Sequence, residues 1–260
     1  MVSISTFNAP NWADLSTPEV DASIEFYRDL LGWEFRTEAT DMGDYHVASV
    51  DGREVCGLMK HPPEMEGAPA MWTVFFHVED IDEMVEKVGA AGGRVLEPPF
   101  EIPNGARVGV VADPTGAMFA LIAGETPVDG VWYSMVPGSV CWTETLTRDT
   151  KTSARFYREI FGWETESDEG GYVSFLLNGE KIAGLLTMPE GVPAEAPAHW
   201  AVYFTVESCE VSERAAVDLG GSVLAESMTV EIGHFAVLED PAGAPFDIMD
   251  FTMTGDPVAV

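Results

Sequence analysis

The sequence predicts an α+β protein of two tandem domains, and its composition, an internal duplication and the order of its turn signals support this prediction. The chain has 260 residues, of which 46% are hydrophobic and 10% aromatic. It is therefore long enough for two domains with cores of their own and too apolar to be disordered. Each half is expected to contain two βαβββ units that form a cupped, mostly antiparallel eight-stranded sheet with helices outside.

The internal duplication is the strongest signal in the sequence. The segment Phe26–Glu34, FYRDLLGWE, returns as Phe156–Glu164, FYREIFGWE. Asp113–Gly116, DPTG, returns in the same order as Asp240–Gly243, DPAG. Two ordered copies predict tandem domains. We expect domain 1 over residues 8–125, a linker over 126–139 and domain 2 over 140–252.

The first unit of each domain is read from its helix signals. Ser16–Glu19 contains a hydroxyl cap, a proline and an acid, which are typical of a helix start. Gly32 is typical of a helix end. The second helix has Ile81, Met84 and Val88 on one face and ends at Gly92. The strands expected around these helices span 12–15, 33–38, 45–50, 54–59, 71–78, the neighbourhood of Val95, 107–112 and 117–122, and the helices of domain 2 are expected near 148–161 and 208–219.

Charge limits the partners of this protein. Lys and Arg number 13 against 44 Asp and Glu, which gives a formal net charge of −31. Such a chain would repel phosphate backbones and anionic lipid, so we expect neither nucleic acid nor a membrane as a partner. A neutral or cationic small molecule is the favoured ligand class. The acidity is also compatible with a general adaptation to salt or crowding.

Cysteines and the chain start indicate the compartment. Cys56, Cys141 and Cys209 are odd in number and far apart, with no CxxC spacing. The first residues contain no basic region followed by an apolar run. We therefore expect a cytoplasmic protein. Because the duplication supplies a partner domain within the chain, a monomer is favoured, with a homodimer as the alternative.

The repeated helix end FYxxLLGW or FYxxIFGW, the DPxGA before each last strand and the βαβββ rhythm together resemble the glyoxalase/bleomycin-resistance group of the vicinal oxygen chelate superfamily. The resemblance covers residues from about 8 to 251, and the most similar subgroup is the bacterial tandem glyoxalase-like proteins that are often labelled hydroxylases without a demonstrated reaction. It implies a divalent metal in the cup, held by His or carboxylate side chains from several strands. Such a metal would polarise substrate oxygens.

This sequence departs from that ligand pattern. The ligand position of the first strand corresponds to Trp12 and Trp142, and an indole cannot bind a metal. The other two positions correspond to Thr73 and Ala120 in domain 1 and to Ala201 and Asp247 in domain 2. We therefore predict no cofactor. The alternative is one divalent metal in domain 2, held by Glu144, His199 and Asp247.

Several side chains are candidates for binding a ligand. Trp12 and Trp142 would face the cup if the family register holds, and would offer it a broad apolar wall. His77 lies on the strand face of Thr73 and Phe75, although a hydrogen-bonded structural role is the more common one for such a histidine. The predicted ligand-binding residues are Trp12, Thr73, Phe75, His77, Trp142, His199, Tyr203 and Asp247.

Two carboxylates are candidates for acid–base chemistry. Asp14 and Glu144 each follow a tryptophan by two positions, so they would share its face of the strand. A carboxylate in an apolar cup is either anchored by hydrogen-bond donors or has a raised pKa and can act as a base. The two acids are repeat equivalents in different domains, so each would need its own partner.

Three functions remain open on the sequence alone. The preferred one is a metal-independent protein that binds an apolar or aromatic metabolite or drug. The alternative is an enzyme, a glyoxalase-like lyase, an isomerase or a dioxygenase-like or hydroxylase-like oxygenase, which uses a metal in domain 2 or a carboxylate base. The third is a protein-interaction module whose cups are filled by side chains, because the fold does not choose among functions.

Overall fold

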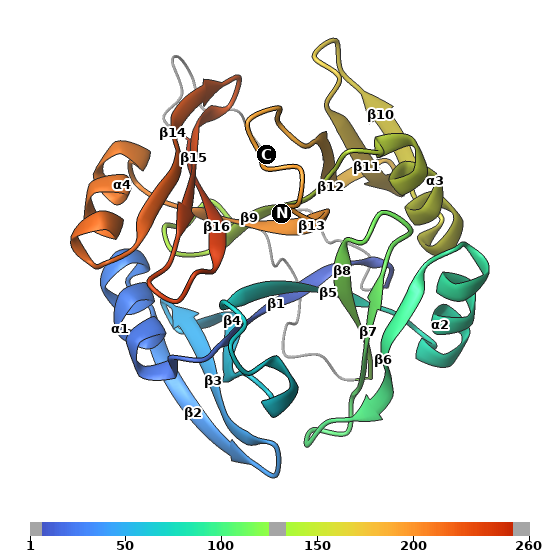
Figure 1. Ribbon diagram of the computed structural model, residues 1–260, viewed down its shortest axis with the longest axis horizontal. Coiled ribbons are helices and arrows are strands. Elements are labelled where there is room, and N and C mark those ends of the chain that lie inside the picture. Colours follow the sequence, from blue (N-terminus) through green and yellow to red (C-terminus); the bar gives the residue numbers. More distant parts are fainter. Residues whose placement is uncertain (1–6, 125–133, 252–260) are drawn as a thin grey trace.

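The computed structural model describes residues 7–124 and 134–251, which form two domains of the same architecture (Figure 1). The predicted linker over 126–139 falls partly on residues outside these ranges, namely 126–133, and so do the predicted domain ends at 125 and 252. The strands and helices of domain 1 are β1 (Ala9–Thr17), α1 (Val20–Leu31), β2 (Glu34–Thr40), β3 (Gly43–Val50), β4 (Arg53–Lys60), the short helix η1 (Pro63–Met65), β5 (Met71–His77), α2 (Ile81–Ala90), β6 (Arg94–Glu101), β7 (Arg107–Ala112) and β8 (Met118–Ala123).

Domain 2 repeats this order without the short helix. Its elements are β9 (Val140–Thr147), α3 (Thr150–Phe161), β10 (Glu164–Ser167), β11 (Val173–Leu177), β12 (Glu180–Thr187), β13 (His199–Thr205), α4 (Cys209–Asp218), β14 (Ser222–Val230), β15 (Gly233–Glu239) and β16 (Pro245–Asp250).

Each domain contains one eight-stranded sheet assembled from two βαβββ units. The strand order is β2-β3-β4-β1-β5-β8-β7-β6 in domain 1 and β10-β11-β12-β9-β13-β16-β15-β14 in domain 2. The units join where β1 pairs antiparallel with β5, and where β9 pairs with β13. The first and last strand of each unit are parallel, as in β1–β4 and β5–β8, and the other pairs are antiparallel. This confirms the predicted fold class.

The start of α1 differs from the prediction. Strand β1 continues through Thr17, and the helix begins at Val20 after Glu19, which makes no side-chain capping bond. The Thr17 hydroxyl is used differently, since it accepts a hydrogen bond from the Glu19 amide and contacts the Ser23 hydroxyl. The predicted end is correct: Gly32 has φ +72°, a left-handed conformation that favours glycine.

One continuous core joins the two domains through the outer faces of their sheets, by which we mean the faces that carry the helices. In Figure 1, α1 lies beside α4 and α2 beside α3, so the helices flank the contact between the domains. Phe204 of β13 meets Trp33 and Trp72 of domain 1 with ring centroids 5.2 Å apart. Phe76 of β5 meets Trp200 of domain 2 at 5.0 Å. Because each outer face is covered by the other, the inner faces point in opposite directions.

The repeated DPxGA motif contributes to this contact between domains. Asp113 closes its own turn through Oδ1 and accepts a hydrogen bond of 3.0 Å from Ser153 of α3 through Oδ2. Asp240 accepts one of 3.2 Å from the Tyr27 hydroxyl of α1 in the same way. Each motif therefore fixes a helix of the other domain.

Candidate functional site

The inner face of domain 1 carries a second, mainly apolar cluster of buried residues, separate from the large core. Its buried residues include Trp12 from β1 and Phe75 from β5, whereas their neighbours Ala13, Val74 and Phe76 face the large core. This alternation follows from the two-residue period of a strand. The inner-face cluster of domain 1 consists of Trp12, Val47, Phe75, Ala106, Val108, Ala120 and Ile122, with Tyr45, Phe100 and Ile102 packed against it.

Asp14 is the acid of this inner face. Its Oδ1 accepts hydrogen bonds from the Trp12 indole at 2.8 Å and from the Tyr45 hydroxyl at 2.7 Å. The indole also donates to the Tyr45 oxygen at 2.9 Å, so the three side chains form a closed triad. Burial raises the pKa of Asp14 to about 6, although the two donors oppose this rise. Among the described residues no donor reaches Asp14 Oδ2.

A glycine on the neighbouring strand makes room for the triad. Gly57 of β4 is the register partner of Asp14 on β1. A Cβ atom at this position would overlap Tyr45 Oη and Asp14 Oδ1. The close approach of the two side chains therefore requires glycine at position 57.

Domain 2 repeats the arrangement around Glu144. Its Oε2 accepts a hydrogen bond of 2.9 Å from the Tyr172 hydroxyl, which in turn accepts one of 2.8 Å from the Trp142 indole. Gly184 is the register partner of Glu144, and a Cβ there would overlap Tyr172 Oη. Burial raises the pKa of Glu144. A buried acid, an indole and a tyrosine thus occur on both inner faces, and in domain 2 the tyrosine lies between the indole and the acid.

Two further polar groups are present on the inner face of domain 2. Tyr203 donates a hydrogen bond of 2.6 Å to Glu144 Oε1. Asp247, the register partner of Tyr203 on β16, is 5% exposed. Burial raises the pKa of Asp247 well above its usual range, and the charge of Glu144 raises it further. No hydrogen-bond donor reaches Asp247 in the part of the chain that the structure describes.

The remaining predicted residues are Thr73, His77 and His199, on β5 and β13. Thr73 is half-buried and is the register partner of Asp14. His77 is 7% exposed, its Nε2 contacts the Gly124 carbonyl at 3.2 Å, and its ring lies 4.7 Å from that of Phe7. These contacts fix the ring in a structural position. His199 is half-buried, and its Nδ1 contacts the Pro197 carbonyl at 3.1 Å.

The side chains at the implied metal-ligand positions do not fit a metal. In domain 1 the Thr73 hydroxyl would be the one ligand, and in domain 2 the Asp247 carboxylate would be the one ligand. The structure also keeps the alternative trio apart, because His199 pairs with Leu146, whereas Asp247 pairs with Tyr203. Within residues 7–124 and 134–251, no group of three or more His, Cys, Asp and Glu side chains is placed to hold a metal ion.

Sequence reasoning missed Tyr45, Tyr172, Gly57 and Gly184. Each tyrosine and each glycine lies at the same place in the two copies of the first βαβββ unit. A comparison of the copies beyond their helices would therefore have revealed both pairs. The contact with the acid depends on the register across β3, β4 and β1, which the sequence does not give.

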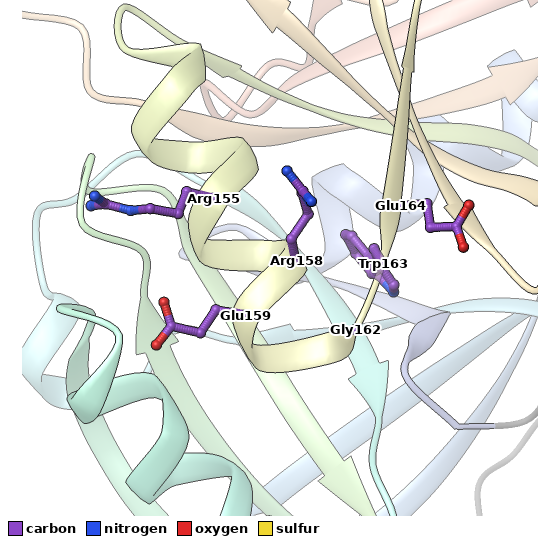
Figure 2. Close-up of a pocket in the computed structure, with 6 residues that line it drawn as sticks. All are labelled: Arg155, Arg158, Glu159, Gly162, Trp163 and Glu164. Atoms are coloured by element: carbon purple, nitrogen blue, oxygen red, sulfur yellow. The ribbon is translucent and has the colours of Figure 1, made fainter.

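A surface pocket of about 520 Å³ opens elsewhere, at the end of α3 (Figure 2). Figure 2 shows that Arg155 and Arg158 project from this helix in different directions. Trp163 and Glu164 lie where the chain continues from the helix into strand β10. The pocket is lined by Arg155, Arg158, Glu159, Gly162, Trp163 and Glu164. Because it contains none of the inner-face residues and mixes both charges, we do not assign the candidate site to it.

In the described ranges, every helix is too short or too polar to cross a membrane.

Comparison with known proteins gives matches over both domains. Residues 9–121 match the glyoxalase/bleomycin resistance protein/dioxygenase superfamily, and residues 140–249 match the glyoxalase-like domain. The anthracycline biosynthesis protein DauV of Streptomyces sp. (strain C5) is 35% identical over 259 residues, which cover 93% of each chain.

Two solved structures are similar in fold. The Mn(II)-bound glyoxalase from Novosphingobium aromaticivorans has a TM-score of 0.63 at 15% identity, with 96% of this chain and 84% of that chain covered. The 2,3-dioxygenase LapB from Pseudomonas sp. KL28 has a TM-score of 0.64 at 15% identity, with 97% and 96% covered. At this identity the likeness concerns the fold alone.

Proposed function

The chain belongs to the glyoxalase/bleomycin resistance protein/dioxygenase superfamily, and from this premise we propose that it binds a small apolar or aromatic molecule on the inner faces of its sheets without a metal. The proposal rests on one observation above all. Both inner faces carry a buried acid in place of a set of metal ligands: Asp14 accepts hydrogen bonds from an indole and a tyrosine, and Glu144 accepts them from two tyrosines.

The residues of the inner faces indicate the chemistry of this ligand. Trp12 and Phe75 supply buried aromatic rings to the inner face of domain 1, and the half-buried Trp142 supplies one in domain 2. Asp14 Oδ2 is an acceptor without a donor among the described residues, so a ligand hydroxyl or amine would hydrogen-bond there. The name of the relative DauV places it in anthracycline biosynthesis. Because anthracyclines are polycyclic aromatic compounds, we take aromatic molecules as the first ligands to test.

The test is a titration of the full chain with 1-naphthalenemethanol, an aromatic alcohol, by isothermal calorimetry. We expect saturable binding that weakens at least tenfold in a Trp12→Ala, Trp142→Ala double variant. A Trp163→Leu variant, which alters an indole of the large core, serves as the control and should retain binding if folded. An absence of saturable binding to the wild-type protein would contradict the proposal.

A second function is favoured by the pKa of Asp14, which burial raises to about 6. A carboxylate with a pKa near neutrality is a competent general base. At a pH equal to this raised pKa, half of the Asp14 side chains are deprotonated, whereas an unperturbed aspartate is fully ionised. In this function, Asp14 takes a proton from a C–H or O–H bond of the bound molecule, leaving a carbanion or alkoxide and a neutral carboxyl group. Tyr45 and Trp12 would then hold the carboxyl in place.

This second function has a separate test. The aromatic ketone 2-tetralone exchanges the protons next to its carbonyl with D₂O, and proton NMR measures the rate. A basic Asp14 or Glu144 predicts that the protein accelerates the exchange and that an Asp14→Asn, Glu144→Gln double variant does not. Equal rates with the wild-type protein and with the double variant would exclude catalysis by these acids, while leaving ligand binding untouched.

A further inference from the structure

The inner faces of the two domains differ at two adjacent positions. Domain 1 has Phe75 on β5 paired with Ala120 on β8. At the equivalent positions, domain 2 has Tyr203 on β13 paired with Asp247 on β16. An aromatic ring and a methyl group in one domain are thus replaced by a phenol and a second carboxyl group in the other.

We propose that domain 2, unlike domain 1, recognises its ligand through a protonated amine held between Glu144 and Asp247. The inference rests on the proposed function and names the ligand class of one of its two sites. The hydroxyls of the neighbouring Tyr172 and Tyr203 both donate to Glu144, one to each of its carboxylate oxygens, and not to Asp247. Asp247 is 5% exposed and receives no donor from the described residues.

A buried carboxyl group without a donor is costly, so a ligand that supplies one is favoured. An alkylammonium group suits this position because it carries a positive charge and three N–H donors. The ligand can donate one N–H to Asp247 and another to Glu144. The charges of these two carboxylates interact with each other. The half-buried indole of Trp142 provides an adjacent aromatic surface that also attracts cations. In domain 1, Ala120 offers no such second acid.

The experiment compares two probes of nearly the same shape. 1-Naphthylmethylamine is a cation at pH 7.5, whereas 1-naphthalenemethanol is neutral. Both are titrated into the full chain by isothermal calorimetry. We expect one site per chain that binds the amine at least tenfold more tightly than the alcohol.

Variants of Asp247 identify the source of this preference. Asp247→Asn keeps the shape of the side chain, and Asp247→Ala copies Ala120 of domain 1. Either change should reduce the preference for the amine over the alcohol to within about twofold, and an unchanged thermal unfolding transition verifies the fold. Asp29→Asn, which removes the same charge from the exposed side of α1, is the control and should leave the preference unchanged.

The outcomes separate the two proposals. Equal affinity of the wild-type protein for amine and alcohol would overturn the amine site and leave the proposed function standing. A preference that survives in both Asp247 variants would also overturn it. If neither probe binds, the proposed function fails and the amine site fails with it.

Discussion

Tyr203 donates a hydrogen bond of 2.6 Å to Glu144 on the inner face of domain 2, at a position where domain 1 has Phe75. The bond couples β13 to β9 through side chains as well as through the backbone. It also occupies the Glu144 oxygen that Tyr172 leaves free. Both inner faces thus contain an acid, an indole and a tyrosine, but their hydrogen bonds and surroundings differ, which leads to separate predictions for each.

Replacement of the Tyr203 hydroxyl tests this bond. Tyr203→Phe copies the residue of domain 1 and leaves one oxygen of a buried acid without its donor. We expect the free energy of unfolding to fall by about 1–3 kcal/mol. A double-mutant cycle with Glu144→Gln, measured by urea denaturation, should give a coupling energy of about 1 kcal/mol or more. A coupling energy near zero would show that the bond contributes nothing to stability.

The stability of the protein should depend on pH through Asp14. Burial raises its pKa in the folded protein from the ordinary value of 3.8 to about 6. Between about pH 4 and pH 6 the folded state therefore holds a proton that the unfolded state has lost, so the free energy of unfolding falls as the pH rises across this window.

An Asp14→Asn variant should lack this contribution. Its stability relative to the wild-type protein should therefore increase from pH 4 to pH 7 by up to about 3 kcal/mol. Urea denaturation at intervals of half a pH unit measures the increase, and Asp29→Asn corrects for the change in net charge. Parallel stability curves for Asp14→Asn and the wild-type protein would contradict the raised pKa.

Alanine at position 57 or 184 should disrupt the hydrogen bond between Tyr45 and Asp14 or between Tyr172 and Glu144. The new Cβ would overlap Tyr45 Oη at the first site and Tyr172 Oη at the second. We expect a loss of about 1–3 kcal/mol in the free energy of unfolding at each site. Gly89→Ala is a matched control, since a Cβ at this helical position meets nothing within 4 Å. The control should stabilise by about 0.5–1 kcal/mol, and a similar gain at position 57 would refute the requirement for glycine.

The two domains should unfold together. Their outer faces form one core, in which Phe204 of domain 2 lies against Trp33 and Trp72 of domain 1. Phe204→Ala should lower the stability of the whole chain by about 3–5 kcal/mol. Tryptophan fluorescence and far-UV circular dichroism should report a single coincident transition in both proteins. Two resolved transitions, with one unaffected by the substitution, would show that the domains are independent.

The order of the elements could be predicted from the sequence because its signals are local. The glycine at position 32, the repeated FYxxxxGW segment and the periodicity of α2 each report on their own neighbourhood. Helix α1 starts later than predicted, because Ser16 and Thr17 have the hydroxyls of a helix cap but continue β1. Here pairing with β4 and β5 outweighs the local preference.

The acids and indoles of the candidate site could also be chosen from the sequence, since Trp12 and Asp14 lie two residues apart on one strand. Their tyrosine partner could not, because Tyr45 approaches from two strands away across β4. The same holds for Asp247, which lies two strands from Glu144 and is brought to the same inner face by the pairing of β13 with both β9 and β16. Contacts that depend on sheet register are set by the whole fold.

The central claim is that the inner faces bind an aromatic small molecule without a metal. The most direct test is calorimetric titration of 1-naphthalenemethanol into the full chain, first after dialysis against EDTA and then after dialysis against Mn²⁺ or Zn²⁺. We predict saturable binding with the same Kd in all three conditions. Binding that is absent after EDTA and restored by one equivalent of metal per chain would contradict the account.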